Sequence, residues 1–144
     1  MLLVDANLLL YAVDEEAAHH ERAHGWLDAA LARNEPIAFS WLAVLAFLRL
    51  STHPAVFFRP LTPDQAADIV ELWLAQPAAS VLEPGRRHLA LLRGLLLESG
   101  TAGNLVNDAH LAALALEHGA TIVSFDRDFD RFQGVRWRLP QRTQ

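Results

Sequence analysis

Short apolar segments of the chain alternate with longer segments in which hydrophobic residues recur three and four positions apart. The short segments, such as residues 2–4 and 37–39, have no polar face, which predicts strands buried on both sides. The longer segments, such as residues 20–34, predict amphipathic helices. The predicted strands are 2–4, 37–39, 81–82, 121–125 and 135–137, and the predicted helices are 7–14, 20–34, 41–50, 62–75, 86–98 and 104–118.

Local sequence signals mark several helix ends. Thr62, Pro63 and Asp64 supply a capping hydroxyl, a proline for the first turn and an acid, which together begin a helix. Glycines at positions 100 and 119 are expected to end the helices that precede them. Residues 41–50 are apolar on every side apart from one arginine, so we expect this helix to be central and buried.

The alternation of strands and helices predicts an α/β fold, in which a parallel sheet lies between two layers of helices. A chain of 144 residues fits one compact domain. We therefore expect residues 1–144 to form a single three-layer sandwich around four to five short, mostly parallel strands. In such folds, ligands bind beyond the carboxyl ends of the strands.

Composition excludes several kinds of chemistry. The chain has no cysteine, which excludes disulfides, thiolate zinc sites, iron–sulfur clusters and a cysteine nucleophile. It also has no lysine, which excludes a P-loop and Schiff-base catalysis. The formal net charge of −5 argues against nonspecific nucleic-acid binding, although the arginines that follow Asp126 could form a basic edge.

The amino terminus does not resemble a targeting segment. Asp5 interrupts its apolar run, and no basic residue precedes that run, so it predicts neither a signal peptide nor a membrane span. The longest uncharged segment elsewhere, residues 36–48, is also too short to span a membrane. We expect a cytoplasmic protein.

Three aspartates are placed where an α/β fold would bring them together. Asp5 and Asp126 follow predicted strands, and Asp108 lies in the first turn of a predicted helix between them. Each also has a structural alternative: Asp5 could cap a helix, Asp108 could complement a helix dipole, and Asp126 could belong to a solvated loop. Convergence favours a shared site, because clustered carboxylates repel one another unless a cation or a proton joins them.

A cation held by carboxylates alone is best explained as Mg²⁺, with Mn²⁺ as a substitute. The chemistry that such an ion supports most naturally is phosphodiester hydrolysis. Ser124 could add a hydrogen bond near the ion, or it could be a satisfied strand hydroxyl. Arg49 could contact a phosphate, or it could form a structural ion pair.

Longer motifs point to a family. The segments LLVDANLLLYA, FLRLSTHP, FFRPLTP and AGNLVNDAHLAALALEHGATIVSFDRDFDRF span nearly the whole chain, and together they resemble a PIN domain of the VapC toxin type. The resemblance implies a PIN-like sandwich and an Mg²⁺-dependent ribonuclease that cleaves particular RNAs, often tRNA. It implies Asp5 and Asp108 as the main metal ligands and Asp126 as a third acidic site residue. It makes Asp128 and Asp130 weaker candidates.

The same resemblance implies a cognate antitoxin as partner, and the apolar helices lead us to expect a homodimer. One position departs from the family pattern: Ala46 stands where many PIN domains carry a glutamate. The sequence therefore leaves open a second function, a non-catalytic RNA-binding or interaction module on the same fold. A small-molecule phosphohydrolase is a third and less favoured reading.

Overall fold

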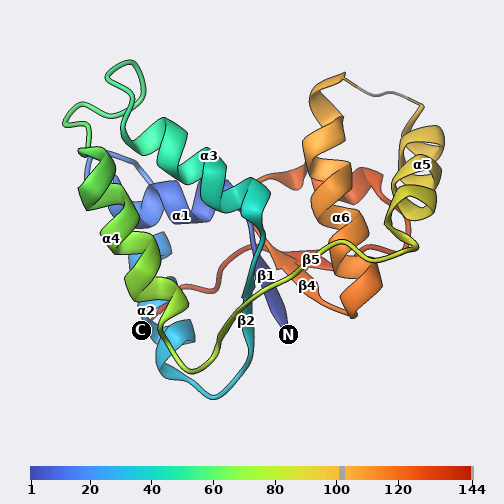
Figure 1. Ribbon diagram of the computed structural model, residues 1–144, viewed down its shortest axis with the longest axis horizontal. Helices are drawn as coiled ribbons and strands as arrows, with labels where there is room; N and C mark the ends of the chain where they lie inside the picture. Colours follow the sequence, from blue (N-terminus) through green and yellow to red (C-terminus); the bar gives the residue numbers. More distant parts are fainter. Residues whose placement is uncertain (101–102, 144) are drawn as a thin grey trace.

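The computed structural model describes residues 1–100 and 103–143, whose centre is a parallel sheet of five short strands in the order β3-β2-β1-β4-β5 (Figure 1). The strands are β1 (Leu2–Val4), β2 (Ile37–Phe39), β3 (Ala79–Val81), β4 (Thr121–Val123) and β5 (Trp137–Arg138). The helices are α1 (Ala6–Val13), α2 (His20–Ala32), α3 (Trp41–Ser51), α4 (Pro63–Leu74), α5 (His88–Ser99) and α6 (Val106–His118), with 3₁₀ turns η1 (Gly103–Leu105) and η2 (Arg127–Arg131).

Helices cover both faces of the sheet, as the sequence predicts. Figure 1 shows α1 to α4 on one side of the sheet and α5 and α6 on the other. Strand β1 supplies both cores: Leu2 and Val4 pack against α1 to α4, whereas Leu3 packs with α5, α6 and η2. This division follows the two-residue period of a strand. The three-layer α/β sandwich is therefore confirmed.

The topology places β1 in the middle of the sheet, paired with β2 on one side and β4 on the other. Because all strands are parallel, the carboxyl ends of β1 and β4 reach the same edge. Helix α1 begins immediately beyond β1, and α3 begins just beyond β2. This edge is where the fold brings a ligand site.

Most predicted boundaries agree with the structure, and the exceptions have local causes. The capping box at Thr62 and Gln65 begins α4, and Gly119 ends α6 in the left-handed conformation at φ 65°. Strand β3 begins earlier than predicted, at Ala79, because an edge strand tolerates the exposed Ser80. Strand β4 ends at Val123 rather than at residue 125, because the chain turns there into η2.

The prediction that α3 is buried on every side is wrong. Its inner face, which includes Ala43, Val44 and Phe47, is buried, but Trp41 is 48% exposed and Leu45 is 58% exposed. The helix lies at the border of a cavity, so its outer apolar face has no covering layer within the described residues. None of the helices in the described part of the chain combines the length and hydrophobicity needed to cross a bilayer.

Candidate active site

Asp5 lies at the junction of β1 and α1, and its carboxylate accepts three hydrogen bonds, the longest of them, at 3.3 Å, from Asn7 Nδ2. Its Oδ1 accepts a 2.7 Å hydrogen bond from the backbone N–H of Ala6, which caps α1. Its Oδ2 accepts a 2.7 Å hydrogen bond from the hydroxyl of Ser124, which follows β4. Burial raises the pKa of Asp5, the hydrogen bonds from Ser124 and Ala6 oppose that rise, and the charge of Asp126 adds to it. Asp5 thus caps α1, and the same carboxylate also faces the neighbouring strand.

Ser124 is the centre of a hydrogen-bond network that joins β1 to β4. Its fully buried hydroxyl accepts hydrogen bonds from Asn7 Nδ2, at 3.0 Å, and from the backbone N–H of Asp126, at 2.9 Å. Asn7 Oδ1 in turn accepts from the backbone N–H of Phe125, at 3.2 Å. Sequence reasoning considered Ser124 but missed Asn7, although its position two residues after Asp5 was an available signal. The network fixes where the chain beyond β4 enters the site.

Asp108 enters the site from the first turn of α6, as predicted. One carboxylate oxygen each from Asp108, Asp126 and Asp128 lie within 4.8 Å of one another. Burial, followed by the charges of Asp5, Asp126 and Asp128, raises the pKa of Asp108 to about 7. Asp5 is therefore near enough to act on Asp108 electrostatically, but it lies outside the 4.8 Å group found among the described residues.

The three acids of η2 and its cap separate into two groups. Asp126 Oδ1 accepts a 2.9 Å hydrogen bond from the backbone N–H of Asp128, which holds both residues in one tight turn. Asp130 is directed elsewhere, because its Oδ1 accepts a 2.7 Å hydrogen bond from Trp137 Nε1. From the sequence, Asp128 and Asp130 are equally weak candidates, and only the geometry of the turn distinguishes them.

A cavity of about 460 Å³ opens beside these acids, between α3 and α6. It is lined by Asp5, Ala6, Ser40, Leu42, Ala43, Leu45, Ala46, Arg49, Asn107, Asp108 and Leu111. One wall therefore carries Asp5 and Asp108, and the opposite wall on α3 is largely apolar. Ala46 lies on that wall, so the position without an acid does face the site.

Arg49 is the one charged residue that α3 contributes to this cavity. It forms no ion pair with any residue the structure describes, so the structural ion pair considered from sequence is absent. Its guanidinium is exposed and remains available to an anion. The cavity thus combines an acidic wall with a cationic group on the facing helix.

The donors at this site are all oxygens, which suits a hard divalent cation. Carboxylates whose burial and mutual repulsion raise a pKa are stabilised when a cation enters between them. Asp108, Asp126 and Asp128 are the residues that could hold such an ion, with Asp5 beside them. The arrangement could then serve hydrolysis of a phosphate ester.

The sequence matches a known family and a characterised type of protein within it. A family model described as PIN domain matches residues 2–135. The chain is 51% identical over 140 residues to Ribonuclease VapC37 of Mycobacterium tuberculosis, covering 97% of each chain.

Two solved structures show the same fold at low sequence identity. VapBC2 from Rickettsia felis, bound to a DNA fragment from its promoter, superposes with a TM-score of 0.70 at 17% identity, covering 96% of this chain and 97% of the other. Mycobacterium tuberculosis VapC20, described as a sarcin-ricin loop cleaving toxin, superposes with a TM-score of 0.68 at 16% identity, covering 94% and 99%.

Proposed function

The chain belongs to the PIN-domain family, in its VapC branch, and from this premise we propose that it is an RNA-hydrolysing toxin of a toxin–antitoxin pair. The observation that supports this most strongly is the convergence of Asp108, Asp126 and Asp128 near Asp5, beside a cavity that Asp5 and Asp108 line. Residues 1–144 would act as one domain, since the site acids come from segments packed around a single sheet. An RNA substrate would place its action in the cytoplasm.

The proposed cofactor is Mg²⁺, with Mn²⁺ as a substitute. The donor set fits, because four carboxylates lie close together. Among the described residues, the only arginine paired with one of them is Arg131, whose Nε lies 3.7 Å from Asp128 Oδ1. Asp108, Asp126 and Asp128 would hold the ion, and Asp5 would complete the negative charge around it. When bound, such an ion lowers the pKa of a water ligand and stabilises charge on a phosphate oxygen.

The remaining residues of the site would position the acids and the substrate. Ser124 keeps the Asp5 carboxylate turned toward the site by donating to its Oδ2. Asp126 and Asp128 keep their mutual geometry through the turn that Asp126 caps. Arg49, exposed at the cavity, would pair with a phosphate group of the RNA and offset the acidic charge of the facing wall.

The alternative of a non-catalytic module on the same fold is not favoured. It depended on the absence of an acid at Ala46, but the structure assembles four acids without any contribution from α3. Asp128 provides the additional carboxylate that the sequence analysis ranked low. A protein that only bound RNA would have no need of clustered anions that repel its substrate.

Two kinds of RNA are the candidate substrates. VapC20 is described as cleaving the sarcin-ricin loop, and the family resemblance points to tRNA, so ribosomal RNA and tRNA are the substrates to compare. Incubation of the purified protein with total bacterial RNA, with Mg²⁺ or with EDTA, followed by sequencing of the new RNA ends, tests the activity. We expect discrete cleavage sites that disappear with EDTA; uncut RNA in both conditions would contradict the proposal.

The proposed partners are an antitoxin and a second copy of the chain. The Rickettsia felis structure is that of a VapBC2 assembly, and the exposed Trp41 and Leu45 on α3 leave apolar surface for such a contact. An antitoxin segment is expected in an apolar groove near α1 and α2, by the helix-in-groove mode. Light scattering at micromolar concentration tests the homodimer, and a monomeric mass would contradict it.

A further inference from the structure

Three aromatic rings from separate parts of the chain meet at Phe125, the residue that precedes Asp126 of the acidic cluster. Tyr11 comes from α1, His19 from the turn before α2, and Phe125 from the segment after β4. The rings of His19 and Phe125 are stacked, with centroids 4.6 Å apart and planes 15° from parallel. Tyr11 meets Phe125 edge-on at 5.4 Å and meets His19 at 5.7 Å. We call these three residues the aromatic platform.

The aromatic platform is attached directly to the site network. Phe125 lies between Ser124, which bonds to Asp5, and Asp126, which belongs to the carboxylate group. Its backbone N–H donates to Asn7 Oδ1, so its position is fixed by the network that orients Asp5. Since adjacent Cα atoms are about 3.8 Å apart, the Phe125 backbone is a direct neighbour of the site.

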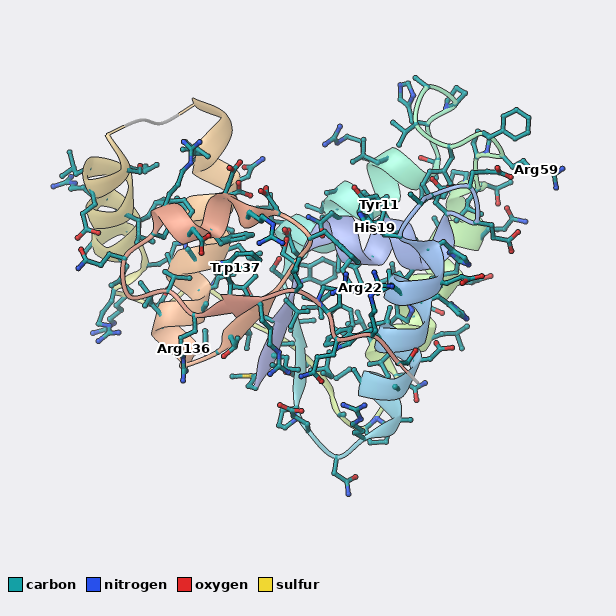
Figure 2. The ribbon with its side chains drawn as sticks, turned by 180° about the vertical axis from the view of Figure 1, so that it is seen from behind. Tyr11, His19, Arg22, Arg59, Arg136 and Trp137 are labelled. Atoms are coloured by element: carbon teal, nitrogen blue, oxygen red, sulfur yellow. The ribbon has the colours of Figure 1, made fainter. Side chains whose placement is uncertain are left out.

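The aromatic platform is anchored in the core by two of its residues and exposed at the third. Tyr11 and Phe125 are half-buried and pack against the core beneath α1 to α4. His19 is exposed, and its ring stacks on Phe125. Figure 2 shows Tyr11, His19 and Arg22 close together on one side of the molecule.

Helix capping does not explain His19. It occupies the N-cap position of α2, where serine, threonine, aspartate or asparagine is preferred, and its side chain makes no capping hydrogen bond. The side chain is instead held flat against Phe125. An exposed ring that is held in place loses little conformational freedom when another flat group stacks on it.

Arg22 adds a cation to the same place. Its Cζ lies 5.6 Å from the centroid of the Phe125 ring, and its Nε donates a 2.8 Å hydrogen bond to the carbonyl of Pro140. The guanidinium is thereby fixed beside the aromatic platform, and a guanidinium is a group that pairs well with phosphate. A stacking surface with a neighbouring cation is the usual arrangement for binding unpaired nucleotides.

We propose that His19, supported by Phe125, stacks on an unpaired base of the RNA next to the scissile phosphate and so helps to determine which RNA is bound. The proposal rests on the proposed function, because it assumes an RNA substrate at the neighbouring acids. Stacking on a ring depends on the flat face of a base, which every base has, and hardly on its hydrogen-bonding edge. The site would therefore favour single-stranded segments and loops over paired RNA.

The test measures binding rather than cleavage. A randomised single-stranded RNA pool is titrated by fluorescence anisotropy in Mg²⁺, with the Asp108→Asn change in every protein to suppress cutting. We expect His19→Ala to weaken binding on the order of tenfold, and His19→Phe to retain it. His24→Ala is the matched control, because His24 is an exposed histidine within α2 whose side chain pairs with Asp28, and this variant should bind as the parent does.

A second measurement separates stacking from a merely structural role. With a short RNA that the parent protein binds, abasic nucleotides are introduced one position at a time. At one position the abasic change should weaken binding to the parent but not to His19→Ala, since both changes remove the same stack. Equal affinity of His19→Ala and the parent, or independent effects at every position, would overturn the proposal. RNA that is bound but never cut by the wild-type chain would instead contradict the proposed function.

Discussion

The hydroxyl of Ser124 donates a 2.7 Å hydrogen bond to Oδ2 of Asp5, across 119 positions of sequence. This bond joins the ends of the two central strands, β1 and β4, at the edge where the acids gather. The same hydroxyl receives the backbone N–H of Asp126, so a single buried oxygen positions two of the four carboxylates. The arrangement of the acids therefore depends on Ser124, an uncharged residue.

Replacing Ser124 by alanine should weaken both the fold and the metal site. The change removes a donor to Asp5 and leaves the N–H of Asp126 unpaired, which typically costs about 1–3 kcal/mol for each buried group. Thermal unfolding and calorimetric titration with Mn²⁺ measure the two effects. Ser51→Ala is a matched control, because the buried Ser51 Oγ has no hydrogen-bond partner among the described residues, and it should be nearly neutral. A similar small effect in both variants would contradict the role of Ser124.

The acids after β4 should differ in their effect on metal binding. Asp126→Asn and Asp128→Asn each remove a negative charge from the carboxylate group, so both should weaken Mn²⁺ binding and slow RNA cleavage. Asp130→Asn should leave the affinity unchanged, since Asp130 bonds to Trp137 instead. Calorimetric titration of the three variants with Mn²⁺ measures these affinities. Unchanged affinity in Asp126→Asn would remove that residue from the site.

Introducing an acid at position 46 should tighten metal binding. Ala46 is half-buried on the wall of the cavity that Asp5 and Asp108 also line, so a glutamate there can extend into the cavity instead of entering the core. A further carboxylate raises affinity for a divalent ion. Mn²⁺ titration of Ala46→Glu measures the change, and Ala46→Gln serves as the uncharged control. Severe loss of stability in both variants would show that the position is packed.

The raised pKa of Asp108 predicts how stability without metal depends on pH. Its value of about 7 in the folded chain exceeds the ordinary 3.8, so between these values the folded state holds a proton that the unfolded state has lost. This contribution to stability is complete below 3.8 and is lost as pH rises through about 7. Asparagine cannot ionise, so the Tm of Asp108→Asn should gain on that of wild type as pH rises. A constant difference from pH 4 to 8, measured in EDTA, would contradict the shift.

Much of the fold follows from the sequence because its signals are local. Residues 2–4 and 37–39 lack a polar face, and a strand of this kind must be covered on both sides. Both strands form where predicted and are buried. The burial of α3 could not be predicted in this way. An apolar helix looks the same whether the chain covers it or leaves it beside a cavity, as at Trp41 and Leu45.

The candidate site shows the same limit. Strand ends and a helix start indicated Asp5, Asp108 and Asp126, because parallel strands bring those positions to one edge. Spacing alone could not separate Asp128 from Asp130, since their directions depend on the turn capped by Asp126 and on the distant Trp137. The contribution of Asn7 depends equally on a tertiary contact, its hydrogen bond to Ser124.

The most direct measurement of the central claim is RNA cleavage by Asp5→Asn and Asp108→Asn with Mg²⁺ present. Each change removes a negative charge from the site at nearly constant shape, so the cleavage rate should fall on the order of a thousandfold. Circular dichroism should show that both variants are folded, and Asp130→Asn, whose side chain bonds to Trp137 instead, should cut RNA at the wild-type rate. Wild-type cleavage by either folded variant at Asp5 or Asp108 would contradict the assignment of the site.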